Sequence, residues 1–277
     1  MLKIKTMTAE DIPFAKGLTD YEEWGYRTAD FQRLILFEPR GCFVAWLGRK
    51  RIGIVTSTTY GRFGFIGTLI VRQEWKGSGF GVRLMERAIA YLNDRGVGTI
   101  ELDGVFPVVP IYRKFGFKDK YLSLRFKRKP GTAGFSSSSE GHSKFIREIP
   151  GFDRRLTGIE RGRMIRQYLR EFPAEVYTTG TGKLQAYAVL RPRESGVSMI
   201  GPFVATGPGP AEAVLNRILA DHAHDPLIMG IPAVNNSAVD LVQKYGFKNR
   251  EPSLRMFLGE RKDYEKNVYG ILSPEKG

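Results

Sequence analysis

The chain has 277 residues, of which 42% are hydrophobic and 12% aromatic, and a formal net charge of +14 at pH 7. This composition excludes a disordered protein, and the length predicts two domains, each able to bury a core. No apolar run approaches the ~20 residues that cross a bilayer. The opening MLKIKTMTAEDIP lacks a secretory apolar core, and the single cysteine, Cys42, fits a reducing compartment and a plain core position. We therefore expect a cytoplasmic protein without a membrane partner.

The basic residues are scattered, with one dense cluster, RFKRKP, at 125–130. Such an excess can serve nucleic acid, a membrane surface or a polyanionic cofactor, or it can simply solvate the surface. No helix-turn-helix or zinc-finger spacing accompanies it, so we do not expect a nucleic-acid partner. His222 and His224 have no acidic or cysteine cluster around them, so we expect surface helix residues and no metal.

In chain order, the first half predicts an antiparallel meander, an amphipathic helix, a further strand and a short helix. The strands rest on apolar runs broken by glycine-containing turns, and the long helix rests on an apolar stripe of helical period. The predicted segments are hairpin strands at 42–48 and 51–61, a third strand at 63–71, a helix at 82–92, a strand at 99–105 and a helix at 108–114.

A repeat predicts two copies of one fold. A shift of 130 residues lays KFGFKDKYLSLR (114–125) on KYGFKNREPSLR (244–255) with seven of twelve positions identical, where chance gives about one. Between the copies, KRKPGTAGFSSSSEGHSKF is rich in glycine, serine and charge and cannot support a core. We predict a first domain at 1–127, a linker at 128–146 and a second domain at 147–277.

The stretch KGSGFG (76–81) places three alternating glycines between the third strand and the long helix. Glycines before a helix let backbone N–H groups approach an anion, which is typical of a phosphate site. The P-loop pattern is absent from this stretch. The dinucleotide pattern G-x-G-x-x-G fails because position 82 is valine and because a meander, not a βαβ unit, precedes the loop. A plain tight turn is the alternative.

Two stretches together resemble the GNAT N-acetyltransferase superfamily. VRQEWKGSGFGVRLM resembles its acyl-CoA signature, [QR]-x-x-G-x-[GA], with Lys76 in place of glutamine or arginine. LDGVFPVVPIYRKFGF (102–117) resembles its closing strand and helix, in which Leu-Asp leads to Pro-Leu-Tyr-x-Lys-x-Gly-Phe. The resemblance implies an α/β (α+β) fold of two tandem GNAT-like domains, each a mixed, mostly antiparallel sheet flanked by helices.

The resemblance implies acetyl-CoA as the acyl donor, with its pyrophosphate on the glycine loop. It also implies that the backbone N–H of about Val71 stabilises the thioester oxygen and that Tyr112 acts as a general acid toward the leaving thiolate. Packing beside Phe115 and Phe117 is the alternative for Tyr112. The implied cofactor contacts are Val71, Lys76, Gly77, Ser78, Gly79, Phe80, Gly81 and Val82.

The superfamily's usual glutamate base is missing, because FGFIGTLIV has no acid. Asp103 is the nearest carboxylate in a matching motif and can act as the base or equally cap the next helix. Glu23 is a weaker candidate. Its stretch, TDYEEWGYR, corresponds to the superfamily's acceptor-lining helix and loop, which implies substrate contacts for Tyr21, Trp24 and Tyr26 through cation–π stacking. A core role is the alternative for these aromatic residues.

The second copy lacks the expected catalytic features. VATGPGPAEAV replaces the glycine loop, its prolines remove N–H donors, and Val242 stands in place of Tyr112. We therefore predict one working site, in the first domain, of an acetyl-CoA-dependent N-acetyltransferase. It would act through a ternary complex on a small-molecule or peptide amine, without a metal, as a monomer or homodimer. A non-catalytic acyl-CoA-binding regulatory module is the alternative.

Overall fold

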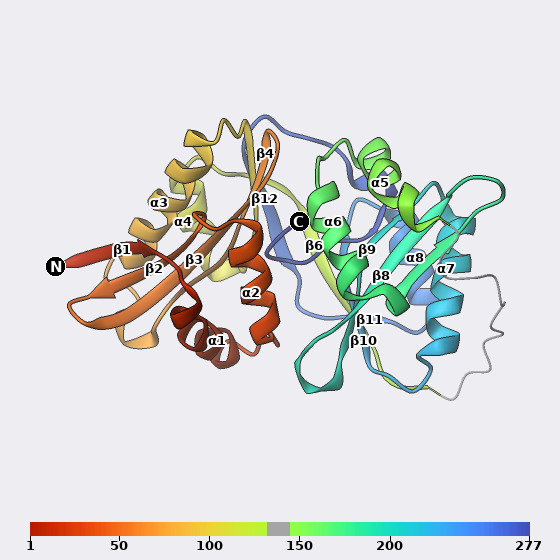
Figure 1. Cartoon of the computed structure of the whole chain (residues 1–277), viewed down its shortest axis with the longest axis horizontal. Coiled ribbons are helices and arrows are strands. Elements are labelled where there is room, and N and C mark those ends of the chain that lie inside the picture. Colours follow the sequence, from red (N-terminus) through yellow and green to blue (C-terminus); the bar gives the residue numbers. More distant parts are fainter. Residues whose placement is uncertain (132–144) are drawn as a thin grey trace. The chain divides into compact units, whose positions relative to one another are not determined.

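The computed structural model describes residues 1–131 and 145–277, which form two compact units (Figure 1). The expected linker therefore lies mostly outside the described residues. No helix in the described part of the chain is long and apolar enough to cross a membrane. The first unit comprises residues 1–119, 256–261 and 274–277, and the second comprises residues 120–255 and 262–273.

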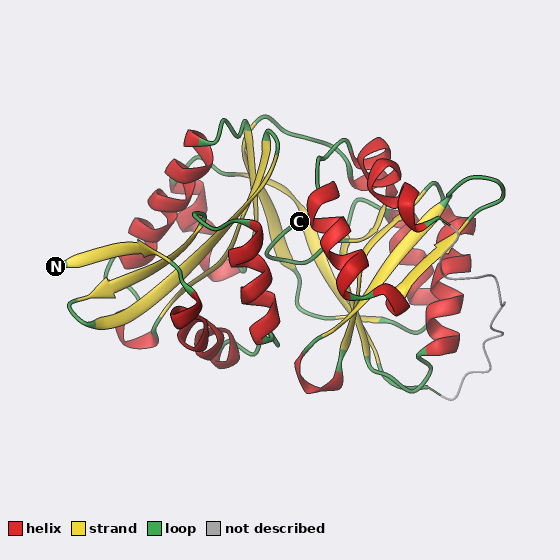
Figure 2. Ribbon diagram, viewed as in Figure 1, coloured by secondary structure: helices red, strands yellow, loops and turns green. Residues whose placement is uncertain are grey.

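In the first unit, a sheet separates helices α1 and α2 on one face from α3 and α4 on the other (Figures 1 and 2). The strands run in the order β1-β2-β3-β4-β5, with the end of β12 beside β5. The elements are β1 (Leu2–Thr6), α1 (Ile12–Tyr21), α2 (Thr28–Phe37), β2 (Cys42–Leu47), β3 (Lys50–Tyr60), β4 (Phe63–Val71), α3 (Phe80–Asp94), β5 (Thr99–Gly104) and α4 (Val109–Lys114).

Helix α3 packs on the sheet through the predicted apolar stripe. Leu84, Met85, Ala88 and Leu92 are buried at spacings of one to four residues. On β4, Gly64 allows this close packing, because a Cβ there would lie 3.1 Å from a methyl carbon of Leu92. The opposite face carries a core formed with α1 and α2, whose members include Ile12, Leu18, Phe31, Leu34, Val44, Ile54 and Ile70.

The pairing of β4 with β5 opens a fork in this sheet. Strands β1 to β4 pair antiparallel, whereas β4 and β5 pair in parallel only as far as Ile66 and Leu102. Beyond that point, β4 continues to Val71 with no β5 partner among the described residues. We call the Gly67–Val71 stretch, which pairs with β3 but not with β5, together with the end of β5 opposite it, the fork.

A bulge lies just beyond the start of the fork. Thr68 has a φ of +45°, which is uncommon for a side-chain-bearing residue. The β3–β4 register shifts between Ile54 and Thr56, as expected where one strand holds an extra residue. The hydroxyl of Thr68 donates to that of Thr56 at 2.8 Å and closes the bulge across the two strands.

The second unit repeats this topology. Strands β7, β8 and β9 form an antiparallel meander, α7 follows, and β10 then pairs in parallel with β9. The mixed, mostly antiparallel sheet predicted for each copy is therefore confirmed. The elements are β6 (Lys118–Arg128), α5 (Ile149–Thr157), α6 (Gly162–Glu171), β7 (Val176–Thr179), β8 (Ala186–Pro192), β9 (Ser198–Ala205), α7 (Pro208–Asp221), β10 (Leu227–Pro232), α8 (Asn236–Lys244), β11 (Lys248–Asn249), β12 (Ser253–Gly259) and β13 (Val268–Gly270).

Each unit contains a strand from the other half of the chain. From residue 120 onward, β6 belongs to the second unit, where it pairs antiparallel with β10. Residues 256–261 belong to the first unit, where the hydroxyl of Thr99 donates to the carbonyl of Glu260 at 2.7 Å. The compact units are therefore not contiguous in sequence, and the boundaries at 127 and 147 stay a prediction about the two copies of the repeat.

Candidate active site

The loop before α3 has an open anion-binding geometry. Gly77 and Gly79 have φ values of +83° and +79°, and Gly79 directly precedes the helix. A Cβ added to either glycine would meet nothing within 4 Å, so both face open space. The first N–H groups of α3, from Phe80 onward, have no acceptor within the helix and lie at its positive end. This combination of free amides and space can hold a phosphate.

Other contacts in the loop hold its shape. The amide of Ser78 donates to the carbonyl of Trp75 at 3.3 Å, so Ser78 offers a ligand its hydroxyl rather than its N–H. The Trp75 and Phe80 rings pack with their centroids 5.9 Å apart. The ammonium of Lys76 lies 3.1 Å from a carboxylate oxygen of Glu22 and links the loop to the end of α1.

The Val71 amide points into the fork. Arg72, one residue later, donates its N–H to the carbonyl of Ile52 on β3 at 2.9 Å. Because successive amides of a strand point to opposite edges, the N–H of Val71 points away from β3, toward the side where β4 has lost β5. The position expected to stabilise a thioester oxygen therefore has its amide directed at the fork.

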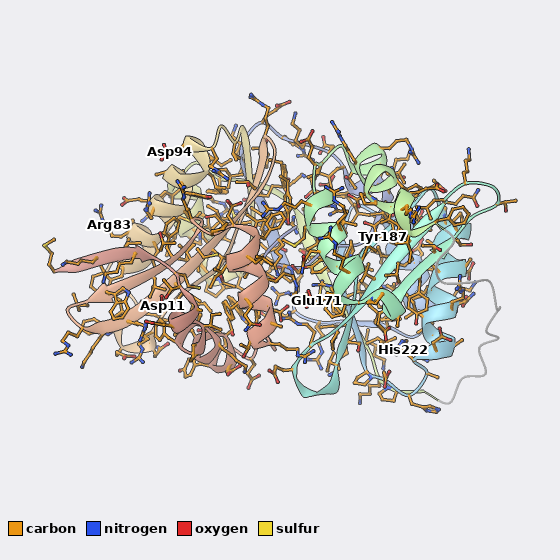
Figure 3. The ribbon with its side chains drawn as sticks, in the orientation of Figure 1. Asp11, Arg83, Asp94, Glu171, Tyr187 and His222 are labelled. Carbon is orange, nitrogen blue, oxygen red and sulfur yellow. The ribbon has the colours of Figure 1, made fainter. Side chains whose placement is uncertain are left out.

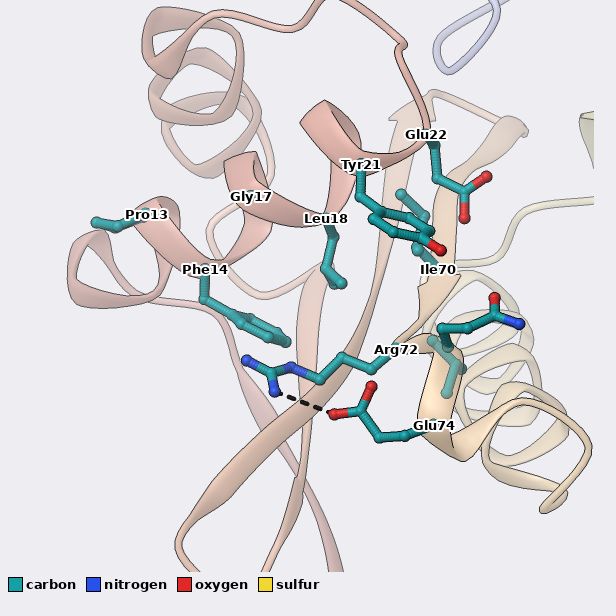
Figure 4. Close-up of a pocket in the computed structure, with 11 residues that line it drawn as sticks. Pro13, Phe14, Gly17, Leu18, Tyr21, Glu22, Ile70, Arg72 and Glu74 are labelled. Carbon is teal, nitrogen blue, oxygen red and sulfur yellow. Dashed lines mark hydrogen bonds and ion pairs between the residues drawn. The ribbon is translucent and has the colours of Figure 1, made fainter.

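A pocket of about 400 Å³ lies between α1 and the end of β4 (Figure 4). Its lining includes the apolar side chains of Phe14, Leu18 and Ile70, and Val71 belongs to it as well. Arg72 places its guanidinium carbon 5.4 Å from the centroid of the Phe14 ring. The pocket therefore joins an apolar wall to the outer end of the fork.

The polar lining of this pocket comes from Tyr21, Glu22, Arg72, Gln73 and Glu74, most of which are labelled in Figure 4. Arg72 and Glu74 pair at 3.1 Å. Of the acceptor residues expected from the sequence, Tyr21 is the one that lines the pocket, and its side chain is 68% exposed. Glu22 was not expected, although it stands next to the proposed Glu23; no residue-type signal separates these two neighbours.

The other expected acceptor residues lie elsewhere. Tyr26 is 3% exposed and packs on Phe31 with ring centroids 5.5 Å apart, so its position is that of the core alternative. Trp24 is half-buried beside Tyr26. Glu23 occupies the turn after α1 with a φ of +56° and is not among the residues that line the pocket.

Tyr112 packs against the end of β5. A Cβ at Gly104 would lie 2.9 Å from the Tyr112 ring, and the Phe117 ring is 6.3 Å away, centroid to centroid. Burial raises the pKa of Tyr112 to about 12, so the hydroxyl keeps its proton throughout the physiological range. Tyr112 and Val71 thus lie at the β5 and β4 ends of the fork respectively.

Asp103 lies on the other face of β5. Phe65 pairs with Glu101 across the parallel ladder, and alternation places Gly67, Glu101 and Asp103 on the same face, away from α3. The next two helical segments begin after Val105 and Val108, neither with a side-chain cap hydrogen bond. Asp103 is therefore not the N-cap residue of either helical segment.

Cys42, His222 and His224 do not form a metal site within the described part of the chain. Burial is the main cause that raises the pKa of the Cys42 thiol to about 12, which makes it an inert core residue. His222, labelled in Figure 3, is less exposed than expected, because its ring contacts Asp225 at 2.7 Å and the Tyr177 hydroxyl at 3.1 Å. Within residues 1–131 and 145–277, no group of three or more His, Cys, Asp or Glu side chains could hold a metal ion.

The corresponding junction of the second unit differs. Helix α7 begins at Pro208, its preceding residue Gly207 is extended with a φ of 174°, and Pro210 occupies the third helical position. Two of the first three helical residues therefore have no N–H to donate. At the position of Tyr112, Val242 is 1% exposed within the core of the unit.

The first unit combines a helix start able to bind an anion with a forked sheet, which is an arrangement suited to acyl transfer. Residues 12–117 match the model of the acetyltransferase (GNAT) family, and residues 149–270 match that of an acetyltransferase (GNAT) domain. The chain belongs to the GNAT acyltransferases and carries two GNAT domains in tandem.

Known proteins agree with this assignment. The chain is 22% identical over 269 residues to a holothin acyltransferase from Pseudoalteromonas sp. (strain SANK 73390), covering 92% of this chain and 88% of that protein. The structure of a putative acetyltransferase from Pyrococcus horikoshii shares the fold with a TM-score of 0.84 at 24% identity, covering 100% of this chain and 96% of that one. A tandem GNAT protein from the clavulanic acid biosynthesis pathway has a TM-score of 0.65 at 14% identity, covering 95% and 100%.

Proposed function

We propose that the protein is an acetyl-CoA-dependent N-acyltransferase with one working site, in the first unit, and a small-molecule or peptide amine as its acceptor. The observation that carries the proposal is the loop from Lys76 to Val82. Its two left-handed glycines face open space at the positive end of a 15-residue helix. A pyrophosphate would accept hydrogen bonds there from backbone amides, and a side chain at Gly79 would occupy its place.

The fork would hold the reacting end of the donor. The β5-facing edge of Gly67–Val71 can hydrogen-bond an extended amide chain, as a missing strand would. The Val71 amide, directed into the fork, would stabilise the negative charge that develops on the thioester oxygen. Loss of one such donor typically costs ~10²–10³ in rate.

Tyr112 would donate a hydrogen bond to the leaving sulfur. Its pKa of about 12 lies well above the ~8.5 of a thiol, so complete proton transfer to the thiolate would be uphill by roughly 5 kcal/mol. A hydrogen bond needs no such transfer. We therefore favour a hydrogen-bond donor over the general acid expected from the sequence.

The pocket beside the fork would take the acceptor. Phe14, Leu18 and Ile70 suit an apolar body, and Tyr21 and Glu22 give the pocket a polar edge. Asp103, on the same sheet face as Gly67 and at the fork's β5 end, would attract the ammonium toward the thioester. An amine with an apolar body, such as 2-phenylethylamine, is the probe that this lining favours.

Calorimetry with acetyl-CoA, followed by thiol release with a panel of primary amines that includes 2-phenylethylamine, tests the proposal. We expect one acetyl-CoA per chain and turnover that requires both substrates. A stoichiometry near two would contradict the single site. Tight binding without thiol release for any amine would favour the non-catalytic acyl-CoA-binding module instead.

A further inference from the structure

The last four residues of the described chain lie inside the first unit, far in sequence from the site. Residues 274–277 belong to this unit, whereas residues 262–273 belong to the second. Glu275 is 3% exposed and Lys276 is fully buried. The Tyr60 hydroxyl on β3 donates to the carbonyl of Lys276 at 3.0 Å. This segment is therefore anchored within the sheet-and-helix core of the unit that carries the site.

Glu275 lies directly against the start of the fork. A Cβ added to Gly67 would lie 2.6 Å from the Cβ and from the carbonyl oxygen of Glu275, closer than real atoms approach. Gly67 is the first residue of β4 beyond its pairing with β5. The absence of a side chain at Gly67 is therefore what lets the 274–277 segment reach β4 at this point.

The sheet face under this segment is polar, although it is buried. Thr56 is paired with Gly67, and Thr58 with Phe65, so both threonines share the face that Glu275 contacts. The Thr58 hydroxyl is buried and has no hydrogen-bond partner among the described residues. A buried, unsatisfied hydroxyl is costly, so this face is suited to a polar group that the protein alone does not supply.

The Glu275 carboxylate already holds an ammonium group. The side-chain nitrogen of Lys276 contacts a carboxylate oxygen of Glu275, and both side chains are buried. Strand β4 itself has no acid, as the sequence FGFIGTLIV shows. Glu275, whose Cβ lies against the start of the fork, therefore brings to this position the type of group that β4 lacks, and its carboxylate already binds an amine cation.

We propose that Glu275 is the general base of the transfer reaction: it binds the acceptor ammonium at the start of the fork and removes its proton. This inference rests on the proposed function and adds a residue to its site. The acceptor ammonium binds the Glu275 carboxylate at the position that the Lys276 ammonium occupies in the structure, and it displaces Lys276 when it enters.

The chemistry balances without a further reactant. The acceptor ammonium gives one proton to the Glu275 carboxylate, and the free amine attacks the thioester carbon. A C–N bond forms, the C–S bond breaks, and the electron pair leaves on sulfur. The proton that the new amide nitrogen sheds neutralises the thiolate, and Glu275 returns its own proton to solvent. The net products are the amide, CoA thiol and one proton.

Several charged or titratable groups surround this position. Lys276 is the direct partner, and its charge reaches the Cys42 thiol from the same segment. Glu38 is engaged elsewhere, because it accepts from the amide and hydroxyl of Thr59 and from the Tyr91 hydroxyl. Around the segment, β2 contributes Cys42, β3 contributes Tyr60, and β5 contributes Glu101 and Asp103.

The test compares Glu275→Gln with the wild-type chain and with Glu86→Gln, an exposed carboxylate on α3 that pairs with Arg83. Rates of thiol release from acetyl-CoA with 2-phenylethylamine are measured from pH 6 to 9.5. We expect Glu275→Gln to lower kcat/KM at pH 7 by ~10²-fold, within the range for loss of a general base. The deficit should shrink about tenfold per pH unit, because the amine, with a pKa of about 10, then deprotonates in solution.

Two further measurements distinguish a catalytic role of Glu275 from an effect on folding and from a failure of the proposed function. Acetyl-CoA affinity by calorimetry should stay within a few-fold in Glu275→Gln. Gly67→Ala keeps the carboxylate but displaces the segment, so it should reproduce the rate loss. Its matched control is Gly151→Ala, where an added Cβ meets nothing within 4 Å.

If Glu275→Gln keeps the wild-type kcat/KM across this pH range, the assignment of Glu275 as the base is wrong. Faster turnover in Glu275→Gln would also contradict it, and would show instead that residues 274–277 inhibit the enzyme. If the wild-type chain acetylates no amine, the proposed function fails. The binding of an amine cation by Glu275 is then tested directly. Calorimetry with 2-phenylethylammonium should then show at least tenfold weaker binding to Glu275→Gln. Equal affinity, or no binding to the wild-type chain, would refute the inference.

Discussion

The strand-to-helix junctions of the two units have the same place in the topology and opposite local chemistry. In the first unit, Gly79 precedes α3 in a left-handed conformation with open space beside it. In the second, Gly207 precedes α7 in an extended conformation, and Pro208 and Pro210 follow within the first turn. The shared fold therefore does not by itself supply the free amides and the open space that a phosphate site needs.

The two units also differ in the ion pairs that they bury. The second unit buries an ion pair in which Arg161 donates to Asp153 at 2.9 and 3.0 Å, and the Tyr187 hydroxyl donates to the same carboxylate at 2.6 Å (Tyr187 is labelled in Figure 3). The first unit buries the pair of Glu275 and Lys276, of which Glu275 lies against the start of the fork. We interpret the network of Arg161, Asp153 and Tyr187 as structural, because it belongs to the unit whose helix start lacks the glycine loop.

The largest contrast is expected from placing the same carboxylate at the two junctions. Gly79→Glu should abolish acetyl-CoA binding, with a loss of ~10³-fold or more, because the new carboxylate would face the pyrophosphate and the φ of +79° disfavours any side chain. Gly207→Glu should bind acetyl-CoA as the wild-type chain does, because a φ of 174° accepts any residue. Calorimetry on both folded variants is the measurement. Unchanged affinity in Gly79→Glu would move the donor site elsewhere.

A large effect on stability without an effect on binding is expected in the second unit. Arg161→Met leaves the Asp153 carboxylate buried without its cation, which typically costs ~3–5 kcal/mol in the free energy of unfolding. Denaturant unfolding should show this loss, whereas acetyl-CoA affinity below the transition should stay within a few-fold. A selective loss of acetyl-CoA binding in the folded variant would show that the second unit contributes to the donor site.

Tyr112→Phe should lower turnover by ~10- to 100-fold with little change in acetyl-CoA affinity, since one hydrogen bond to a charged sulfur is worth about 1.5–3 kcal/mol. Burial keeps the pKa of Tyr112 near 12, and the protonated hydroxyl is the active form. The activity of the wild-type chain should therefore show no decline from this group below about pH 11. If Tyr112→Phe keeps wild-type turnover, Tyr112 has only a packing role against Gly104 and Phe117.

The smallest effect is expected at Asp103. If this side chain only attracts the acceptor, Asp103→Asn should raise the KM for 2-phenylethylamine by about tenfold or less at low ionic strength, with kcat nearly unchanged. The free energy of unfolding should not fall by the ~1 kcal/mol of a lost helix cap, because Val105 and Val108, and not Asp103, are the N-cap residues of the two following segments. A loss of kcat larger than that of Glu275→Gln would make Asp103 the base.

Much of the fold follows from local sequence alone. The helix predicted at 82–92 is α3, Phe80–Asp94, because its apolar stripe has the helical period and Gly79 ends the preceding loop. The strand predicted at 99–105 is β5, Thr99–Gly104. The glycine loop could also be predicted from local sequence, since Gly77 and Gly79 occupy backbone conformations that few other residues adopt. Such features depend on residues within one or two turns of each other.

Only the tertiary structure decided which side chains meet at the site. Composition could not separate Tyr21, which lines the pocket, from Tyr26, which is 3% exposed in the core, because burial depends on the packing of α1 and α2. Nor could sequence distance place Glu275 against Gly67, about 200 residues earlier in the chain. Long-range contacts of this kind are set by how strands and segments assemble, so local sequence determined the elements and the glycine loop, and assembly determined which residues surround the proposed acceptor site.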